Sequence, residues 1–207
     1  MRKALLVFGL FPWLAYAEGG WLTARGRLQP EPRLEAWGGT RTFGAGIVWP
    51  DAPGAAAGLS AELAWAFLDR TVELRGARVW QFSPSRLGTG SATLGASVHA
   101  VPEGFDVGLG PHAGLNLALG GAVFTVDLGL QAGVELFFAP LAPRVPLRGS
   151  ISANLRLGDW GVGLHARAGA DVIPGHSFVG RGELALSIGW FGLPRPRNGG
   201  AAAPAMR

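Results

Sequence analysis

The 207-residue sequence predicts an all-β fold, a transmembrane antiparallel up-and-down β-barrel of ten strands, with eight strands as the alternative count. Three observations lead to this prediction. Apolar and polar residues alternate with a period of two, turn-forming residues separate the alternating segments, and 34 glycines are spread along the chain. Each glycine inside a helix costs about 1 kcal/mol relative to alanine, so the pattern favours strands.

Residues 1–17 are expected to be a secretion signal. Arg2 and Lys3 form its positive end, the segment 4–14 is apolar, and Ala15-Tyr16-Ala17 has the small residues of a cleavage site. The apolar segment is short for a membrane anchor and contains Pro12, which disfavours an N-terminal anchor helix. Residues 18–191 are then the barrel, and residues 192–207 are a disordered periplasmic tail.

An uncharged run from Val107 to Val126 is long enough to cross a membrane as a helix, but the residues around it favour strands. Even-numbered residues from 122 to 138 are all apolar, whereas the odd-numbered ones are mostly polar or glycine. Farther along the chain, five alternating polar residues would scatter around a helix but share one face of a strand: Arg148, Ser150, Ser152, Asn154 and Arg156. The uncharged run is therefore predicted to be two strands joined at Gly120-Gly121.

The same alternation defines the strands in chain order. They are expected at residues 21–28, 34–49, 57–68, 71–82, 88–101, 105–119, 122–138, 146–158, 161–173 and 178–191. Turn residues mark most of the connections: Pro30-Glu31-Pro32, the segment 50–54, Ser83-Pro84-Ser85, Pro102-Glu103-Gly104, Gly120-Gly121, Asp159-Trp160 and Pro174-Gly175. An even strand count places both termini on the periplasmic side, so the loops 139–145 and 174–177 face outside.

The apolar face of these strands is predicted to contact lipid. Most of the strands are longer than the about 9–11 residues that cross a bilayer and the about 5–6 residues common in soluble proteins. Aromatic residues gather near strand ends, as in the girdles of a membrane barrel: Trp21, Trp49, Trp80, Phe82, Phe105, Phe138, Trp160, Phe178 and Trp190. A secreted soluble β-sandwich is the alternative fold.

Over residues 21–191 the chain resembles the small outer-membrane β-barrel proteins of Gram-negative bacteria. The resemblance rests on the alternation, the aromatic girdle and the export signal, and no family-specific motif accompanies it. The chain departs from the common pattern because a tail follows Trp190-Phe191. The resemblance implies an outer-membrane location. It also implies three partners: outer-membrane lipid, the barrel-insertion machinery and a protein complex formed through the periplasmic tail.

Matching the alternation across the short turns gives an expected register for the inward residues. This register sets Asp106 opposite both Glu135 and His99, Arg148 opposite Asp171, Asn154 opposite His165, and Arg167 opposite Glu183. The predicted charge cluster of the lumen is His99, Asp106, Glu135, Arg148, Asp171, Arg167, Arg181 and Glu183. Arg148 is expected to be the main cation that compensates the inward carboxylates.

Composition argues against several classes of function. The chain has no cysteine, which excludes disulfides and thiolate metal sites. Its formal net charge of +4 includes Arg2 and Lys3 of the signal, and no cluster of basic residues supports nucleic-acid binding. The four histidines, at positions 99, 112, 165 and 176, lack ligand spacing to one another, so neither a metal nor a cofactor is expected.

The predicted function is a non-enzymatic, narrow pore for small hydrophilic solutes or ions. The alternative is a structural or complex-forming barrel with a plugged lumen, because about eight strands leave just enough room for side chains. A lipid-modifying hydrolase or acyltransferase is a less favoured alternative, since the resemblance extends to barrel enzymes of that kind. Ser97, His99 and Asp106 form a conceivable Ser–His–acid set, but no motif of those enzymes matches.

Overall fold

The computed structural model describes residues 32–52, 55–82, 88–102, 106–121, 123–138, 141–173 and 179–191. Within them, eleven strands form one antiparallel sheet. The strands are β1 (Arg33–Gly39), β2 (Thr42–Pro50), β3 (Ala57–Ala66), β4 (Thr71–Phe82), β5 (Gly88–Val101), β6 (Asp106–Gly120), β7 (Phe124–Gly133), β8 (Glu135–Phe138), β9 (Leu141–Leu157), β10 (Trp160–Val172) and β11 (Val179–Phe191). No helix in this part of the chain is long and apolar enough to cross a membrane.

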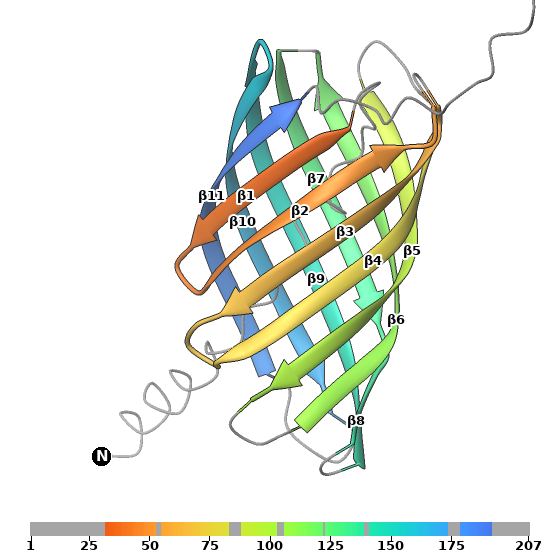
Figure 1. Ribbon diagram of the computed structural model, residues 1–207, viewed down its shortest axis with the longest axis vertical. Helices are drawn as coiled ribbons and strands as arrows, with labels where there is room; N and C mark the ends of the chain where they lie inside the picture. Colours follow the sequence, from red (N-terminus) through yellow and green to blue (C-terminus); the bar gives the residue numbers. More distant parts are fainter. Residues whose placement is uncertain are drawn as a thin grey trace, which may run out of the picture.

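The sheet closes on itself into a barrel, as Figure 1 shows. Strand β1 pairs with β2 on one side and with β11 on the other, and Arg33 lies opposite Phe191. Both ends of the described barrel therefore meet at the same rim. Because β7 and β8 both pair with β6 and with β9, they occupy one position in the ladder. The barrel has ten strand positions, which confirms the expected count.

A proline explains the break between β7 and β8. The backbone N–H of Val134 donates to the carbonyl of Pro111 on β6 at 3.0 Å, but Pro111 has no N–H to return. The register with β6 is the same on both sides of the break: His112 lies opposite Gly133, and Leu109 lies opposite Leu136. The break is therefore a missing ladder bond within one physical strand, since proline cannot donate inside a sheet.

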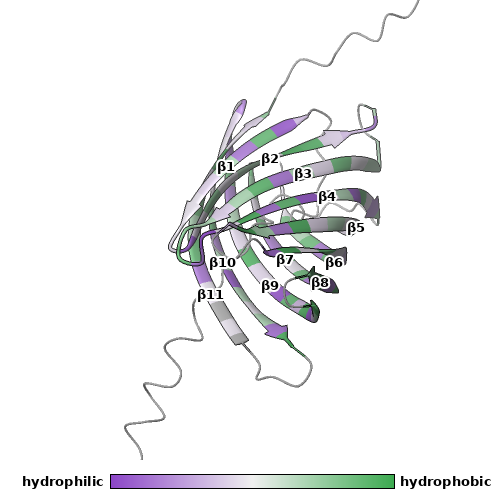
Figure 2. Cartoon of the chain, turned by 60° about the horizontal axis from the view of Figure 1, so that its bottom comes forward, coloured by the Kyte–Doolittle hydropathy of each residue, from purple (hydrophilic) through white to green (hydrophobic). Residues whose placement is uncertain are grey.

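The apolar side chains of the barrel point outward. Leu130 is 69% exposed and Leu186 is 66% exposed, whereas the inward His165 and Glu35 are each 1% exposed. Figure 2 shows hydrophilic and hydrophobic segments alternating along individual strands. This arrangement is the reverse of a soluble protein and suits a barrel surrounded by lipid. The even-numbered residues from 124 to 138 face outward, which confirms the predicted lipid face and the transmembrane barrel.

The second predicted strand was placed wrongly. The segment 34–49 forms two strands, β1 and β2, because the chain reverses at Thr40-Arg41. Inward residues change from odd to even numbers at this turn, but Gly38, Gly39 and Gly44 have no side chains to show the change. The predicted strand 21–28 lies outside the described residues, and the ladder closes without it.

Aromatic residues gather at both rims of the outer face. At the rim that carries Arg33 and Phe191 lie Trp49, Trp80, Phe82, Trp160 and Trp190. The rings of Trp160 and Trp190 stack in register, with centroids 6.2 Å apart. At the other rim Phe138 ends β8 and is half exposed, and Phe67 directly follows β3. Trp21, Phe105 and Phe178 of the predicted girdle lie outside the described residues.

Replacing Leu130 by arginine tests the lipid face. Leu130 lies midway along the β7–β8 strand and points outward, so Leu130→Arg should lower the free energy of unfolding by roughly 2–4 kcal/mol. The matched control is Phe124→Arg, an outward residue at the rim end of the same strand, where the cost falls to about 0–1 kcal/mol. Urea unfolding in lipid vesicles measures both. Equal costs at the two positions would contradict a membrane around β7.

Candidate functional site: a charged network in the barrel lumen

Six inward side chains from five strands form the lumen network: Glu73, Arg75, His99, Glu135, Arg144 and Asp171. The register brings most of them to neighbouring levels. Glu73 lies opposite His99, and Glu135 lies opposite Arg144. Alternation along each strand sends all of these side chains to the inside of the barrel.

Two glycines on β6 allow His99 on β5 to contact Glu135 on β8, although β6 lies between these strands. His99 lies opposite Gly108, whose missing side chain leaves room for the ring of Phe137, because an added Cβ would be 2.6 Å from it. At Gly110 an added Cβ would be 1.7 Å from the carbonyl oxygen of Val134. Only glycine fits these two inward positions, so no side chain of β6 separates His99 from Glu135.

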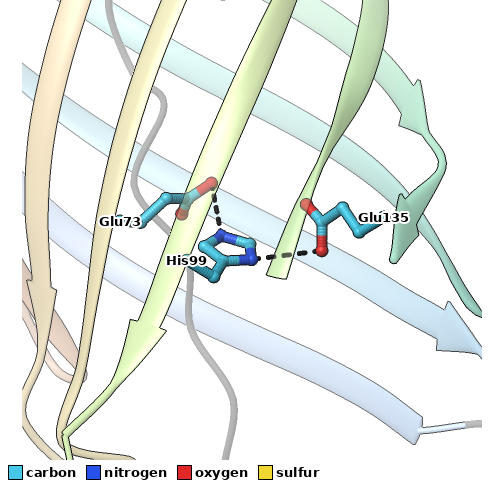
Figure 3. Close-up of side chains that lie close together, drawn as sticks. All are labelled: Glu73, His99 and Glu135. Carbon is cyan, nitrogen blue, oxygen red and sulfur yellow. Dashed lines mark ion pairs between the residues drawn. The ribbon is translucent and has the colours of Figure 1, made fainter. Parts of the chain in front are cut away.

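His99 lies between two carboxylates, as Figure 3 shows. Its Nε2 is 2.8 Å from Oε1 of Glu73, and its Nδ1 is 3.1 Å from Oε2 of Glu135. Each carboxylate also has a further partner. Arg75 contacts Glu73, and the hydroxyl of Ser97 donates to Oε1 of Glu135 at 3.2 Å.

Arg144 joins three other members of the network. Its Nη2 donates to Oε2 of Glu135 at 2.7 Å and lies 3.0 Å from Nδ1 of His99. Its Nη1 donates to Oδ2 of Asp171 at 3.2 Å. The guanidinium also lies over the ring of Phe137, 4.6 Å from the centroid. One arginine therefore compensates two buried carboxylates, an arrangement that guanidinium groups suit because their donors form a rigid fork.

Two contacts reach between strands that are not neighbours in the ladder. Arg144 on β9 contacts His99 on β5, and Nη1 of Arg75 on β4 donates to Oε1 of Gln131 on β7 at 3.1 Å. In both cases two strand positions lie between the partners. These side chains therefore extend across the lumen and narrow it at this level. The acidic and histidine members are almost fully buried, with 2–5% of each side chain exposed.

A second network closes the seam of the barrel. Nη2 of Arg167 on β10 donates to Oε2 of Glu183 on β11 at 2.6 Å. The other oxygen of Glu183 accepts from the backbone N–H of Thr42 on β2 at 2.9 Å. Strand β1 lies between β11 and β2, and an added Cβ at Gly39 would be 2.3 Å from Oε1 of Glu183. Glycine at this position thus lets Glu183 cross β1.

The predicted cluster is brought together in part. His99, Glu135 and Asp171 meet through Arg144, and Arg167 lies opposite Glu183 as expected. Asp106 lies opposite Val101, so its predicted pairing with His99 and Glu135 is wrong. The side chain of Arg181 lies outside the described residues.

Two further pairings are wrong because the turns were placed wrongly. Arg148 lies opposite Gly169 instead of Asp171, and Asn154 lies opposite Gly163 instead of His165. The turn between β9 and β10 consists of Gly158-Asp159, with Gly158 in the left-handed region at a φ of 64°, so Leu157 pairs with Trp160. The β6–β7 turn is also longer than expected, since Gly120 pairs with Thr125.

Three residues of the lumen network were missed from the sequence. Arg144 was assigned to the loop 139–145, but β9 begins at Leu141 and carries Arg144 into the lumen. Pro143 lies in this part of β9, where proline is uncommon because it cannot donate to the ladder. Glu73 and Arg75 lie at inward positions of a correctly predicted strand, so its alternation alone could have identified them.

The closed ladder, the outward apolar face and the buried polar lumen define the class of the protein: an outer-membrane-type β-barrel. No protein-family model and no curated protein matches the sequence. Among solved structures, the chain is similar to the "KdgM porin in complex with disordered oligogalacturonate" at 12% sequence identity. The match covers 77% of this chain and 98% of that chain, with a TM-score of 0.40. The fold is defined by the ladder of this chain, and this distant likeness adds no argument about its solute.

Truncating Arg144 tests whether the lumen network is dry. Arg144→Ala leaves Glu135 and Asp171 without their shared cation, and should cost about 3–5 kcal/mol of unfolding free energy in a water-free site. The matched control is Arg78→Ala, which breaks the exposed pair with Asp51 and should cost about 0–1 kcal/mol. Urea unfolding of both variants in lipid vesicles gives the comparison. A cost for Arg144→Ala as small as that of the control would show that water solvates the network.

Proposed function

We propose that the protein is an exported, non-enzymatic barrel of the Gram-negative outer membrane that forms a narrow passage for small hydrophilic solutes or ions. Residues 1–17 serve as the export signal, and residues 192–207 form a periplasmic tail. The observation that carries the proposal is the lumen network, which places charged side chains on the inner face of a barrel with an apolar exterior. A polar inner face lets a hydrophilic solute cross the membrane without contacting the apolar lipid.

The lumen network is the proposed constriction of this passage. Arg144 and Arg75 extend across the lumen, so they limit the size of what passes. Three carboxylates and two arginines lie within the network, together with His99. Rings of one charge sign make a pore selective, whereas mixed signs favour weak selectivity. The passage therefore suits small ions and small polar molecules of either charge.

A plugged, structural or complex-forming barrel is the second candidate, and one observation favours it. The network side chains are almost fully buried and contact one another across the lumen. Neutralised side chains of this kind fill the interior of small barrels. In that case the lipid-facing surface, the barrel-insertion machinery and partners of the periplasmic tail account for the interactions of the protein.

The contacts of the serines support a non-enzymatic role. The hydroxyl of Ser97 contacts Glu135 instead of His99, and Asp106 lies opposite Val101, two residues along β5 from its expected partner His99. A second pair, Ser187 and His165, is 2.6 Å apart, but Glu35 lies 3.9 Å from the same ring nitrogen. In a Ser–His–acid triad the acid holds the other nitrogen of the imidazole. Neither serine has the arrangement of a nucleophile.

Planar-bilayer conductance of the purified, folded chain tests the passage. We expect small discrete steps with little ion selectivity. Arg144→Ala should enlarge the steps and shift the reversal potential toward cations, because Glu135 and Asp171 lose their cation. Arg78→Ala, outside the lumen network, should leave both unchanged. A silent membrane for both the native chain and Arg144→Ala, with heat-modifiable migration intact, would establish the plugged barrel instead.

An assay on phospholipid and lipopolysaccharide tests the enzymatic alternative. The folded chain is expected to release no fatty acid and to transfer no acyl group. Activity that disappears in Ser97→Ala or His99→Ala would overturn the proposed passage. Ser91→Ala is the matched control, since Ser91 is a buried inward serine on the same strand as Ser97.

A further inference from the structure

Buried ligand atoms in the lumen network lack hydrogen-bond partners. Oε2 of Glu73 is buried and forms no hydrogen bond within the described structure. The other oxygen of this carboxylate, Oε1, lies 2.8 Å from Nε2 of His99. Both ring nitrogens of His112 are buried without a hydrogen bond as well. A buried polar atom without a hydrogen bond is destabilising, so a ligand that satisfies several of these atoms would stabilise the barrel.

The geometry of the three neighbouring side chains fits a single ion. One ligand atom each from Glu73, His99 and Glu135 can be chosen so that all three lie within 4.8 Å of one another. Ligand atoms bound at about 2.0–2.2 Å in a tetrahedral site lie about 3.4 Å from one another, so closing around an ion requires side-chain movements of up to about an ångström. Figure 3 shows the imidazole between the two carboxylates. The three residues come from β4, β5 and β8, which are fixed by the ladder.

We propose that Glu73, His99 and Glu135 bind a divalent transition metal ion, of which Zn²⁺ is the probe of choice. An imidazole nitrogen with carboxylate oxygens suits zinc, cobalt and nickel, whereas magnesium and calcium prefer oxygen ligands alone. His112 is the next inward residue after Gly110, the residue in register with Glu135 on the neighbouring strand.

The charges of the network admit a cation but also compete with it. Glu73, Glu135 and Asp171 carry three negative charges, and Arg75 and Arg144 carry two positive ones. Arg144 contacts both Glu135 and His99, so it holds two of the proposed ligands. It can keep its contact with Asp171 when the metal takes the others. Removing the charge of Arg144 should therefore strengthen metal binding, an effect that a purely structural cluster does not predict.

Isothermal titration of the tag-free, folded full chain with zinc chloride, after treatment with a chelator, tests the site. We expect one zinc ion per barrel and, with cobalt chloride, a visible absorption band that zinc removes. Glu73→Gln and His99→Gln should weaken binding at least tenfold, and Arg144→Gln should strengthen it about tenfold. His165→Gln is the matched control, because His165 is a buried inward histidine outside the lumen network, and should leave zinc binding unchanged.

Three results would overturn the site: no zinc binding by the native chain and Arg144→Gln, unchanged binding by both Glu73→Gln and His99→Gln, or equal binding of magnesium. Heat-modifiable migration verifies folding, and the gain in Arg144→Gln tests the site even where the other two variants do not fold. The site itself does not require an open lumen, and only an effect of zinc on conductance rests on the proposed passage. Zinc binding by a non-conducting barrel would refute the passage alone, whereas conductance without zinc binding would refute the metal site alone.

Discussion

The pairing of β1 with β11 is the constraint on which the rest of the structure depends. In a lipid environment an unpaired backbone N–H or C=O costs several kcal/mol, so a sheet can cross the membrane only when no edge remains. The seam is supported from inside as well. Glu183 crosses β1 at Gly39 and bonds to Thr42 on β2, and Arg167 holds its other oxygen. The polar contacts inside the barrel therefore hold together the same strands whose pairing closes the sheet.

Closure has a chemical consequence for the interior. The apolar side chains face the lipid, so the polar side chains point into the lumen, where they have to neutralise one another's charges and satisfy one another's hydrogen bonds. Buried charges are tolerated only with partners, because the cost of removing an ion from water is several kcal/mol. Glycines on β1 and β6 make these inner contacts possible because they have no side chain. Gly39, Gly108 and Gly110 leave space through which the long side chains of adjacent strands reach partners that are not their ladder neighbours.

Alternation made the fold predictable, whereas register made the site only partly predictable. The period of two fixes which residues point inward, and it identified His99, Glu135, Asp171, Arg167 and Glu183 without knowledge of the turns. Pairing depends instead on the length of each turn, and a turn longer by two residues on one side moves every partner. Arg148 was assigned to the wrong partner because the two-residue turn between β9 and β10 begins one residue earlier than predicted, and Asp106 was separated from Glu135 by the longer β6–β7 turn. The proposed metal ligands could not be identified from the sequence because they lie far apart in the chain, on three strands, and the spacing between histidines does not indicate them.

The width of the lumen at the network is set by side chains rather than by the ladder. Ten strand positions fix the barrel, but Arg144 and Arg75 reach across it through several single bonds each. Arginine side chains can adopt other staggered rotamers without any change in backbone hydrogen bonds. The partners of Arg144 lie on both sides of its guanidinium, Glu135 and His99 on one and Asp171 on the other. A change in the balance between these partners would alter the lumen while the barrel stays closed, so passage and stability need not change together.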